Sequence, residues 1–183
     1  GGLSVVTRAM SGYDAAPVES GAELRMSVLR SPPYAWHDPG VVDDPEQVRF
    51  IDRGRCVFRY WIVPGADEPW LARAGMAIGR PPVGVQEWSH EGEATGARPA
   101  IHVEPDHVLP AALKAPEEGE GLILRLWETA GRRAEVTVRL PALNTEWRGR
   151  IGARALLTLR ATPAAGGWCW SRCNLLEDEA AGA

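Results

Sequence analysis

Short segments in which apolar and polar residues alternate run through most of the 183-residue chain. In Glu23–Arg30, alternate residues such as Leu24 and Met26 fall on one side of an extended strand, and the polar residues between them fall on the other. Such alternation, or a run of β-branched and aromatic residues, predicts strands in six further segments: Leu3–Thr7, Cys56–Val63, Ile101–Glu104, Leu122–Glu128, Ala134–Leu140 and Ala155–Arg160.

Glycine-containing turns separate these segments, as at Ala130–Arg132 and Ala164–Gly167. Leu122–Glu128 and Ala134–Leu140 flank the first of these turns, which predicts that the two strands pair in a hairpin. Several short strands at this spacing are typical of an antiparallel sandwich or barrel. One helix is expected at Glu68–Ile78, where apolar residues recur at helical spacing. The pattern therefore predicts a mainly β fold with one short helix.

The segment Ser31–Asp52 has a different character, because it contains four prolines and shows no clear period. A loop of this length inside a domain is usually functional or disordered. The chain shows no internal repeat and no sharp change in composition. We therefore expect a single sandwich-type domain over residues 1–177, followed by a disordered tail at residues 178–183.

Composition narrows the class of protein. Hydrophobic residues make up 45% and charged residues 24%, as in ordinary soluble globular proteins. The net charge of -4 argues against a nucleic-acid partner, and no apolar run approaches the roughly 20 residues that span a membrane. Cys56, Cys169 and Cys173 do not form a disulfide framework by number or spacing, which favours a cytoplasmic location. The many arginines beside a single lysine indicate a bacterial coding bias.

Candidate chemistry is sparse. His102 and His107 lie five residues apart with two carboxylates between them, but a zinc site needs three or four converging ligands. Satisfied polar groups on the surface or in a loop are therefore the favoured interpretation. Cys56 lies in a strand pattern, which favours a buried, inert thiol over a nucleophile. We find no complete catalytic set and predict neither a catalytic residue nor a metal ligand in this chain.

Several segments, read in order, resemble a known family. The segments are Gly2–Val5 with Gly12–Asp14, Leu24–Pro32, Asp52–Tyr60, Leu113–Glu128 and Asn174–Glu177. Together they resemble the C-terminal β-domain of glycoside hydrolase family 38, the retaining α-mannosidases. Cys56 departs from the pattern, because it stands at a position where that family often has histidine. The resemblance implies an antiparallel β-sandwich that forms part of a galactose-mutarotase-like supersandwich.

The resemblance also implies a multi-domain enzyme. Its N-terminal α/β barrel would carry a zinc ion and an aspartate nucleophile, and a helical bundle would follow. Zinc is thus expected in that barrel and no cofactor in this chain. The whole enzyme would hydrolyse α-mannosides with retention, through a glycosyl-enzyme. The expected partners are the barrel and helical domains and mannose-containing glycans, and the isolated chain is expected to be inactive.

Three residues are candidates for the border of the substrate site: Arg30, Asp52 and Arg53. Domain junctions often carry ligand pockets, and an arginine fork suits sugar hydroxyls or carboxylates. The favoured alternative is that Arg30 and Asp52 pair with each other and fix the long loop. The aromatic residues Tyr13, Trp36 and Trp61 are expected in a core or between domains, in preference to sugar-stacking platforms.

Two other hypotheses stay open. One is a free-standing carbohydrate-binding module, in which exposed tryptophans among the eight in the chain stack on sugars. The other is a structural or oligomerisation domain of an unrelated protein.

Overall fold

The computed structural model describes residues 2–8, 12–32, 50, 54–92 and 96–178. These residues divide into two compact units, with residues 1–66 and 74–81 in unit 1 and residues 67–73 and 82–183 in unit 2. Each unit is described by itself. The expectation of one domain over residues 1–177 stays a prediction.

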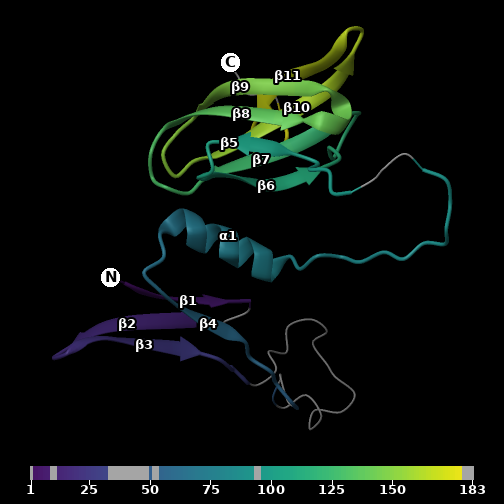
Figure 1. Cartoon of the computed structure of the whole chain (residues 1–183). Coiled ribbons are helices and arrows are strands. Elements are labelled where there is room, and N and C mark those ends of the chain that lie inside the picture. The colour runs from purple at the N-terminus through teal and green to yellow at the C-terminus, as the bar shows by residue number, and fades with distance from the viewer. Residues whose placement is uncertain (1, 9–11, 33–49, 51–53, 93–95, 179–183) are drawn as a thin grey trace, which may run out of the picture. The chain divides into compact units, whose positions relative to one another are not determined.

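Unit 1 contains two small antiparallel sheets and part of one helix (Figure 1). Strand β1 (Leu3–Thr7) pairs with β4 (Tyr60–Pro64), and β2 (Gly12–Val18) pairs with β3 (Gly21–Ser27) across a two-residue turn. Val6 is the one buried hydrophobic residue among the described residues of this unit. Two-stranded sheets are marginally stable in water without a packed face, so unit 1 lacks a substantial core of its own in the described part.

The helix α1 (Glu68–Gly79) confirms the helix expected from sequence. It begins after Asp67, whose side-chain carboxylate accepts a hydrogen bond of 2.8 Å from the backbone N–H of Trp70. This is the usual role of aspartate at a helix N-cap. No residue of the helix is fully buried, and its two halves belong to different units. Within the described ranges, no helix has the length and apolar character needed to cross a membrane.

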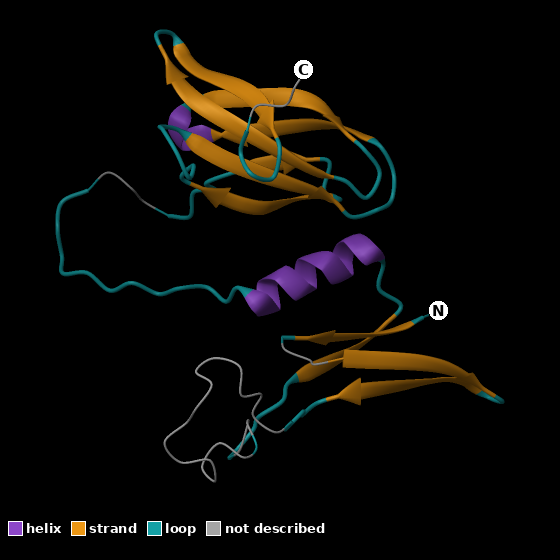
Figure 2. Ribbon diagram, turned by 180° about the vertical axis from the view of Figure 1, so that it is seen from behind, coloured by secondary structure: helices purple, strands orange, loops and turns teal. Residues whose placement is uncertain are grey.

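Unit 2 contains two antiparallel sheets (Figures 1 and 2). The four-stranded sheet has the order β11-β10-β7-β6, and the three-stranded sheet has the order β5-β8-β9. The strands are β5 (His102–Glu104), β6 (Val108–Lys114), β7 (Leu122–Glu128), β8 (Ala134–Leu140), β9 (Thr145–Ile151), β10 (Leu156–Ala164) and β11 (Gly167–Cys173), with a short 3-10 helix at Pro141–Leu143.

A single apolar cluster joins the two sheets of unit 2. The four-stranded sheet contributes Val108, Leu124, Leu126 and Leu159, and the three-stranded sheet contributes Val136, Val138 and Ile151. Burial of side chains from both inner faces is what defines a β-sandwich. The predicted fold class, mainly β with an antiparallel sandwich and one short helix, is confirmed.

The predicted hairpin is wrong, although both of its strands exist with the predicted bounds. β7 pairs with β6 and β10, whereas β8 pairs with β5 and β9, so the two strands lie in different sheets. The connection Thr129–Arg133 therefore crosses from one sheet to the other. The physical reason is a buried carboxylate at Glu128, which gathers the backbone N–H groups of this connection and is described below.

The expectation for Cys56 is also wrong. Its thiol is exposed, because the strand predicted at Cys56–Val63 begins only at Tyr60, where pairing with β1 starts. Residues 55–59 are described but form no strand. The nearest hydrogen-bond partner of the Cys56 thiol is the carbonyl oxygen of Gly54, at 3.9 Å.

Replacing Leu159 tests the core of the sandwich. Leu159 is 0% exposed at the centre of the apolar cluster, so Leu159→Ala is expected to lower the free energy of unfolding of unit 2 by about 2–4 kcal/mol. Leu156→Ala, in the same strand at 54% exposure, is the matched control and should cost less than about 1 kcal/mol. Hydrogen exchange of the most protected amides in β7 measures both. Equal costs for the two variants would contradict the proposed core.

Candidate functional site

The structure leaves the predicted substrate border largely untested. Arg30 lies beyond the end of β3 and is exposed, whereas Asp52 and Arg53 lie outside the described residues. The role of these three residues stays a prediction. Tyr13 and Trp61 are exposed, so a core position is wrong for both, and Trp36 lies outside the described residues. Packing of Tyr13 and Trp61 against another domain stays a prediction.

The histidine pair does not converge on a common site. His102 and Glu104 lie exposed on β5, while His107 is buried in the turn before β6. In the part of the chain that is described, no group of three or more His, Cys, Asp or Glu side chains is arranged to hold a metal ion. The family resemblance places zinc in the barrel and not in this chain, so that expectation stays a prediction.

A buried glutamate organises one end of the sandwich. Glu128 ends β7 and is fully buried. Its carboxylate accepts hydrogen bonds from the N–H groups of Ala130 (2.7 Å), Gly131 (3.0 Å) and Arg132 (3.1 Å) in the β7–β8 connection. It also accepts one from the N–H of Arg154 (2.7 Å) in the β9–β10 connection. One side chain therefore fixes two turns that lie far apart in sequence.

The charge state of Glu128 follows from these contacts. Burial alone raises the pKa of the carboxyl group, because the ionised form loses its hydration. The four N–H donors, led by that of Arg154, stabilise the ionised form, and the net pKa lies below its usual value. His107 is the only ionisable neighbour of Glu128 at ion-pair distance within the described ranges, with its Nε2 3.9 Å from Oε1. Glu128 is thus a structural anion.

A second buried carboxylate holds the end of the described chain. Glu177 accepts a hydrogen bond of 2.7 Å from the backbone N–H of Glu117 and lies 2.7 Å from the Lys114 ammonium. The guanidinium group of Arg125 lies 3.5 Å away and also donates to the carbonyl oxygen of Leu175 at 2.9 Å. These contacts bind the segment after β11 to β6 and β7. The Lys114 ammonium, followed by the Glu117 N–H, lowers the pKa of Glu177.

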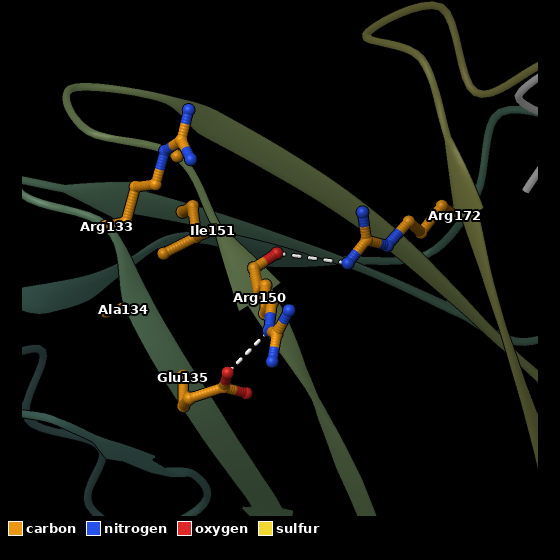
Figure 3. Close-up of a pocket in the computed structure, with 7 residues that line it drawn as sticks. Arg133, Ala134, Glu135, Arg150, Ile151 and Arg172 are labelled. Carbon is orange, nitrogen blue, oxygen red and sulfur yellow. Dashed lines mark hydrogen bonds and ion pairs between the residues drawn. The ribbon is translucent and has the colours of Figure 1, made fainter.

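A pocket of about 500 Å³ opens beside β8, β9 and β11 (Figure 3). Seven residues line it: Arg133, Ala134, Glu135, Arg150, Ile151, Gly152 and Arg172. Its volume lies within the range of roughly 300–1,000 Å³ that small-molecule sites occupy.

Two of the arginines of this pocket are positioned by neighbours. Arg150 forms an ion pair with Glu135, its cross-strand partner on β8. Arg172 donates a hydrogen bond of 3.0 Å to the carbonyl oxygen of Arg150, and its guanidinium carbon lies 5.9 Å from the centre of the Trp147 ring. Figure 3 shows the Arg172 side chain reaching from β11 toward β9. Sequence reasoning missed this pocket because it did not recognise β9 and β11 as strands.

Comparison with known proteins gives one match. Residues 107–182 match the family model described as the glycosyl hydrolases family 38 C-terminal beta sandwich domain. No curated protein and no solved structure matches the chain. The match spans β6 to β11 and so includes most of the sandwich. It confirms the family resemblance for this part of the chain, including the segments Leu113–Glu128 and Asn174–Glu177, whereas the resemblance before residue 107 stays a prediction.

Neutralising Glu128 tests its structural role. Glu128→Gln is expected to lower the stability of unit 2 by about 2–3 kcal/mol at neutral pH, because an amide accepts less strongly and turns its own donor toward N–H groups. The folded-state pKa of Glu128 is depressed, so its contribution is present above the unfolded value of about 4.3 and is lost as the pH falls through the folded value. The variant should therefore lose less stability than the native chain on acidification.

The matched control is Glu135→Gln, an exposed carboxylate on β8, the next strand along the chain. Stability is measured by hydrogen exchange at neutral and acid pH for all three proteins. A Glu128→Gln protein as stable as the control at neutral pH would refute the anchoring role.

The contacts of Glu177 predict a local effect. Glu177→Gln is expected to speed amide exchange at Glu117 and Asn174, because the charge that binds Lys114 is lost, while the amides of β7 keep their rates. Glu120→Gln, in the exposed β6–β7 turn, serves as the control. A uniform increase in exchange across the sandwich would contradict a purely local clamp.

Proposed function

We propose, from the match of residues 107–182 to the family 38 C-terminal sandwich, that the chain is a non-catalytic C-terminal part of a retaining α-mannosidase. The match is the single observation that carries the proposal. In the proposal, the barrel of the same enzyme supplies the zinc ion and the nucleophile, and mannose-containing glycans are the substrates. This chain supports that barrel and borders the active site.

The buried carboxylates of the sandwich support a non-catalytic role. A general acid of a retaining glycosidase needs a raised pKa, so that it is protonated when the substrate binds. The pKa of Glu128 and that of Glu177 are both lowered. Both oxygens of Glu128 accept from backbone N–H groups of the same fold, whereas Glu177 accepts from the Glu117 N–H and lies against the Lys114 ammonium. Neither carboxylate therefore suits proton transfer to a leaving group.

The apolar surface of unit 1 supports the proposed partners. Its described strands expose several large apolar side chains and bury very few, and two-stranded sheets of this kind need a further layer to be stable. The exposed side chains include Leu3, Tyr13, Leu24, Tyr60, Trp61 and Ile62. We assign this surface to contact with the barrel or helical domain of the same enzyme. Arg30, Asp52 and Arg53 are the candidates for the lip that faces the substrate.

A carbohydrate-binding module is the second candidate, because Trp88 is 95% exposed. An exposed indole offers a flat apolar face, and the apolar face of a pyranose ring stacks on such a surface.

Two assays of the 183-residue chain separate these candidates. The proposal predicts no hydrolysis of an aryl α-mannoside, with or without added zinc, and robust turnover would overturn it. Titration with mannose oligosaccharides, followed by tryptophan fluorescence, should give no tight binding. Tight binding that Trp88→Ala abolishes and Tyr13→Ala retains would favour the module instead.

The coding sequence gives an independent test. Upstream of residue 1 and in the same reading frame, we expect a barrel-encoding segment with metal-binding histidine and aspartate residues. An in-frame stop codon close upstream would contradict the proposal.

A further inference from the structure

The arginine pocket beside β8, β9 and β11 takes no part in the function proposed above. The three arginines that line it come from separate segments (Figure 3). Arg133 precedes β8, Arg150 lies next to the end of β9, and Arg172 lies next to the end of β11. Three chain segments thus place like charges around one hollow. The fields of neighbouring like charges add, so this arrangement creates a site with a positive potential.

The pocket is not neutralised from within. Glu135 is the one carboxylate that lines it, against three arginines, which leaves two positive charges uncompensated. The side chains of Arg150 and Glu135 are 82% and 72% exposed, so the ion pair between them is strongly screened by water. Among the described residues, the Arg133 side chain has no hydrogen-bond or ion-pair partner. A bound anion would therefore face positive charge that no carboxylate of the pocket compensates.

The donors of the pocket are partly preorganised. Arg172 donates one N–H to the carbonyl oxygen of Arg150, and its guanidinium group lies over the Trp147 ring. An arginine has five N–H donors in a planar fork, so four remain for a ligand. A fork of this kind matches the paired oxygens of a carboxylate, sulfate or phosphate. Because two neighbours already hold Arg172, ligand binding costs less side-chain entropy than it would at a free arginine.

The rest of the wall sets the shape of the ligand. Ala134, Ile151 and Gly152 complete the lining, and the pocket of about 500 Å³ is larger than a bare oxyanion requires. We propose that this pocket binds a small oxyanion (phosphate, sulfate or carboxylate), alone or carried by a sugar. The inference does not depend on the mannosidase proposal, since it rests on the arginines alone.

Titration of the isotopically labelled 183-residue chain with inorganic phosphate at low ionic strength tests the site. NMR is expected to show saturable shifts at the amides of Arg133, Arg150 and Arg172, and this mapping on the native chain requires no variant. Shifts spread evenly over surface arginines would overturn the proposal.

Affinity measurements on variants sharpen the test. Arg133→Gln and Arg172→Gln are each expected to weaken phosphate binding about tenfold or more, because each removes a charge-assisted hydrogen bond. The matched control is Arg148→Gln, which removes the same charge from β9 but outside the pocket, and it should change affinity less than about twofold. Equal weakening by all three would indicate a general charge effect and overturn the site.

A second series identifies the source of the anion. Mannose 6-phosphate that binds more tightly than inorganic phosphate supports a sugar-borne group, and equal affinities support the oxyanion alone. Methyl α-mannoside, which is neutral, should not bind at the pocket. If it shifted the same amides with the affinity of phosphate, the anion site would be refuted, while the mannosidase proposal would be untouched.

Discussion

The buried carboxylate of Glu128 is the interaction on which the architecture of the sandwich depends. An ionised group in an apolar interior is costly unless it is fully hydrogen-bonded. Here four backbone N–H groups satisfy it, and they come from the two connections that cross or join the sheets. The backbone N–H of Glu128 itself donates to the carbonyl oxygen of Ala155. The charge therefore holds β7, the β7–β8 connection and the β9–β10 connection at fixed positions.

The arginine pocket lies next to this anchor. Arg133 directly follows Arg132, and Gly152 lies two residues before Arg154, so both pocket residues adjoin donors of the Glu128 carboxylate. A turn that is held at its N–H groups places the following side chain reproducibly, whereas a mobile turn does not. The same buried anion that links the sheets thus positions one rim of the proposed oxyanion site.

The strands of unit 2 show what a sequence can and cannot predict. The two-residue period gave β7 its bounds, since Leu124, Leu126 and Glu128 share the inward phase of one strand. The same alternation places Glu128 on the inward side of β7, and this position was the sequence signal for a buried anion. The alternation of residues within a strand does not show to which sheet the strand belongs, because pairing depends on partners distant in sequence. The Gly131 turn therefore predicted a hairpin where the chain changes sheets.

The missed strands have local reasons. Pro110 interrupts the donor pattern of β6, and the register shifts between Pro110 and Ala112. In β9, Gly149 stands where an apolar residue would mark the inward face, and a Cβ there would lie 2.4 Å from the Trp147 ring. The Trp147 ring thus occupies the space that a side chain at residue 149 would fill. The inward face of β9 is therefore apolar in the structure, although the sequence shows no apolar residue at this position.

The two units differ in what they do with their apolar residues, and this difference bears on function. Unit 2 buries the apolar side chains of its strands between two sheets, and its buried carboxylates accept hydrogen bonds from its own backbone. Unit 1 has strands of the same kind, but its described residues bury little beyond Val6. Apolar strand faces without a second layer are stable only when something covers them. The proposal of a supporting domain accounts for this difference, because in that proposal a partner domain covers the strand faces of unit 1.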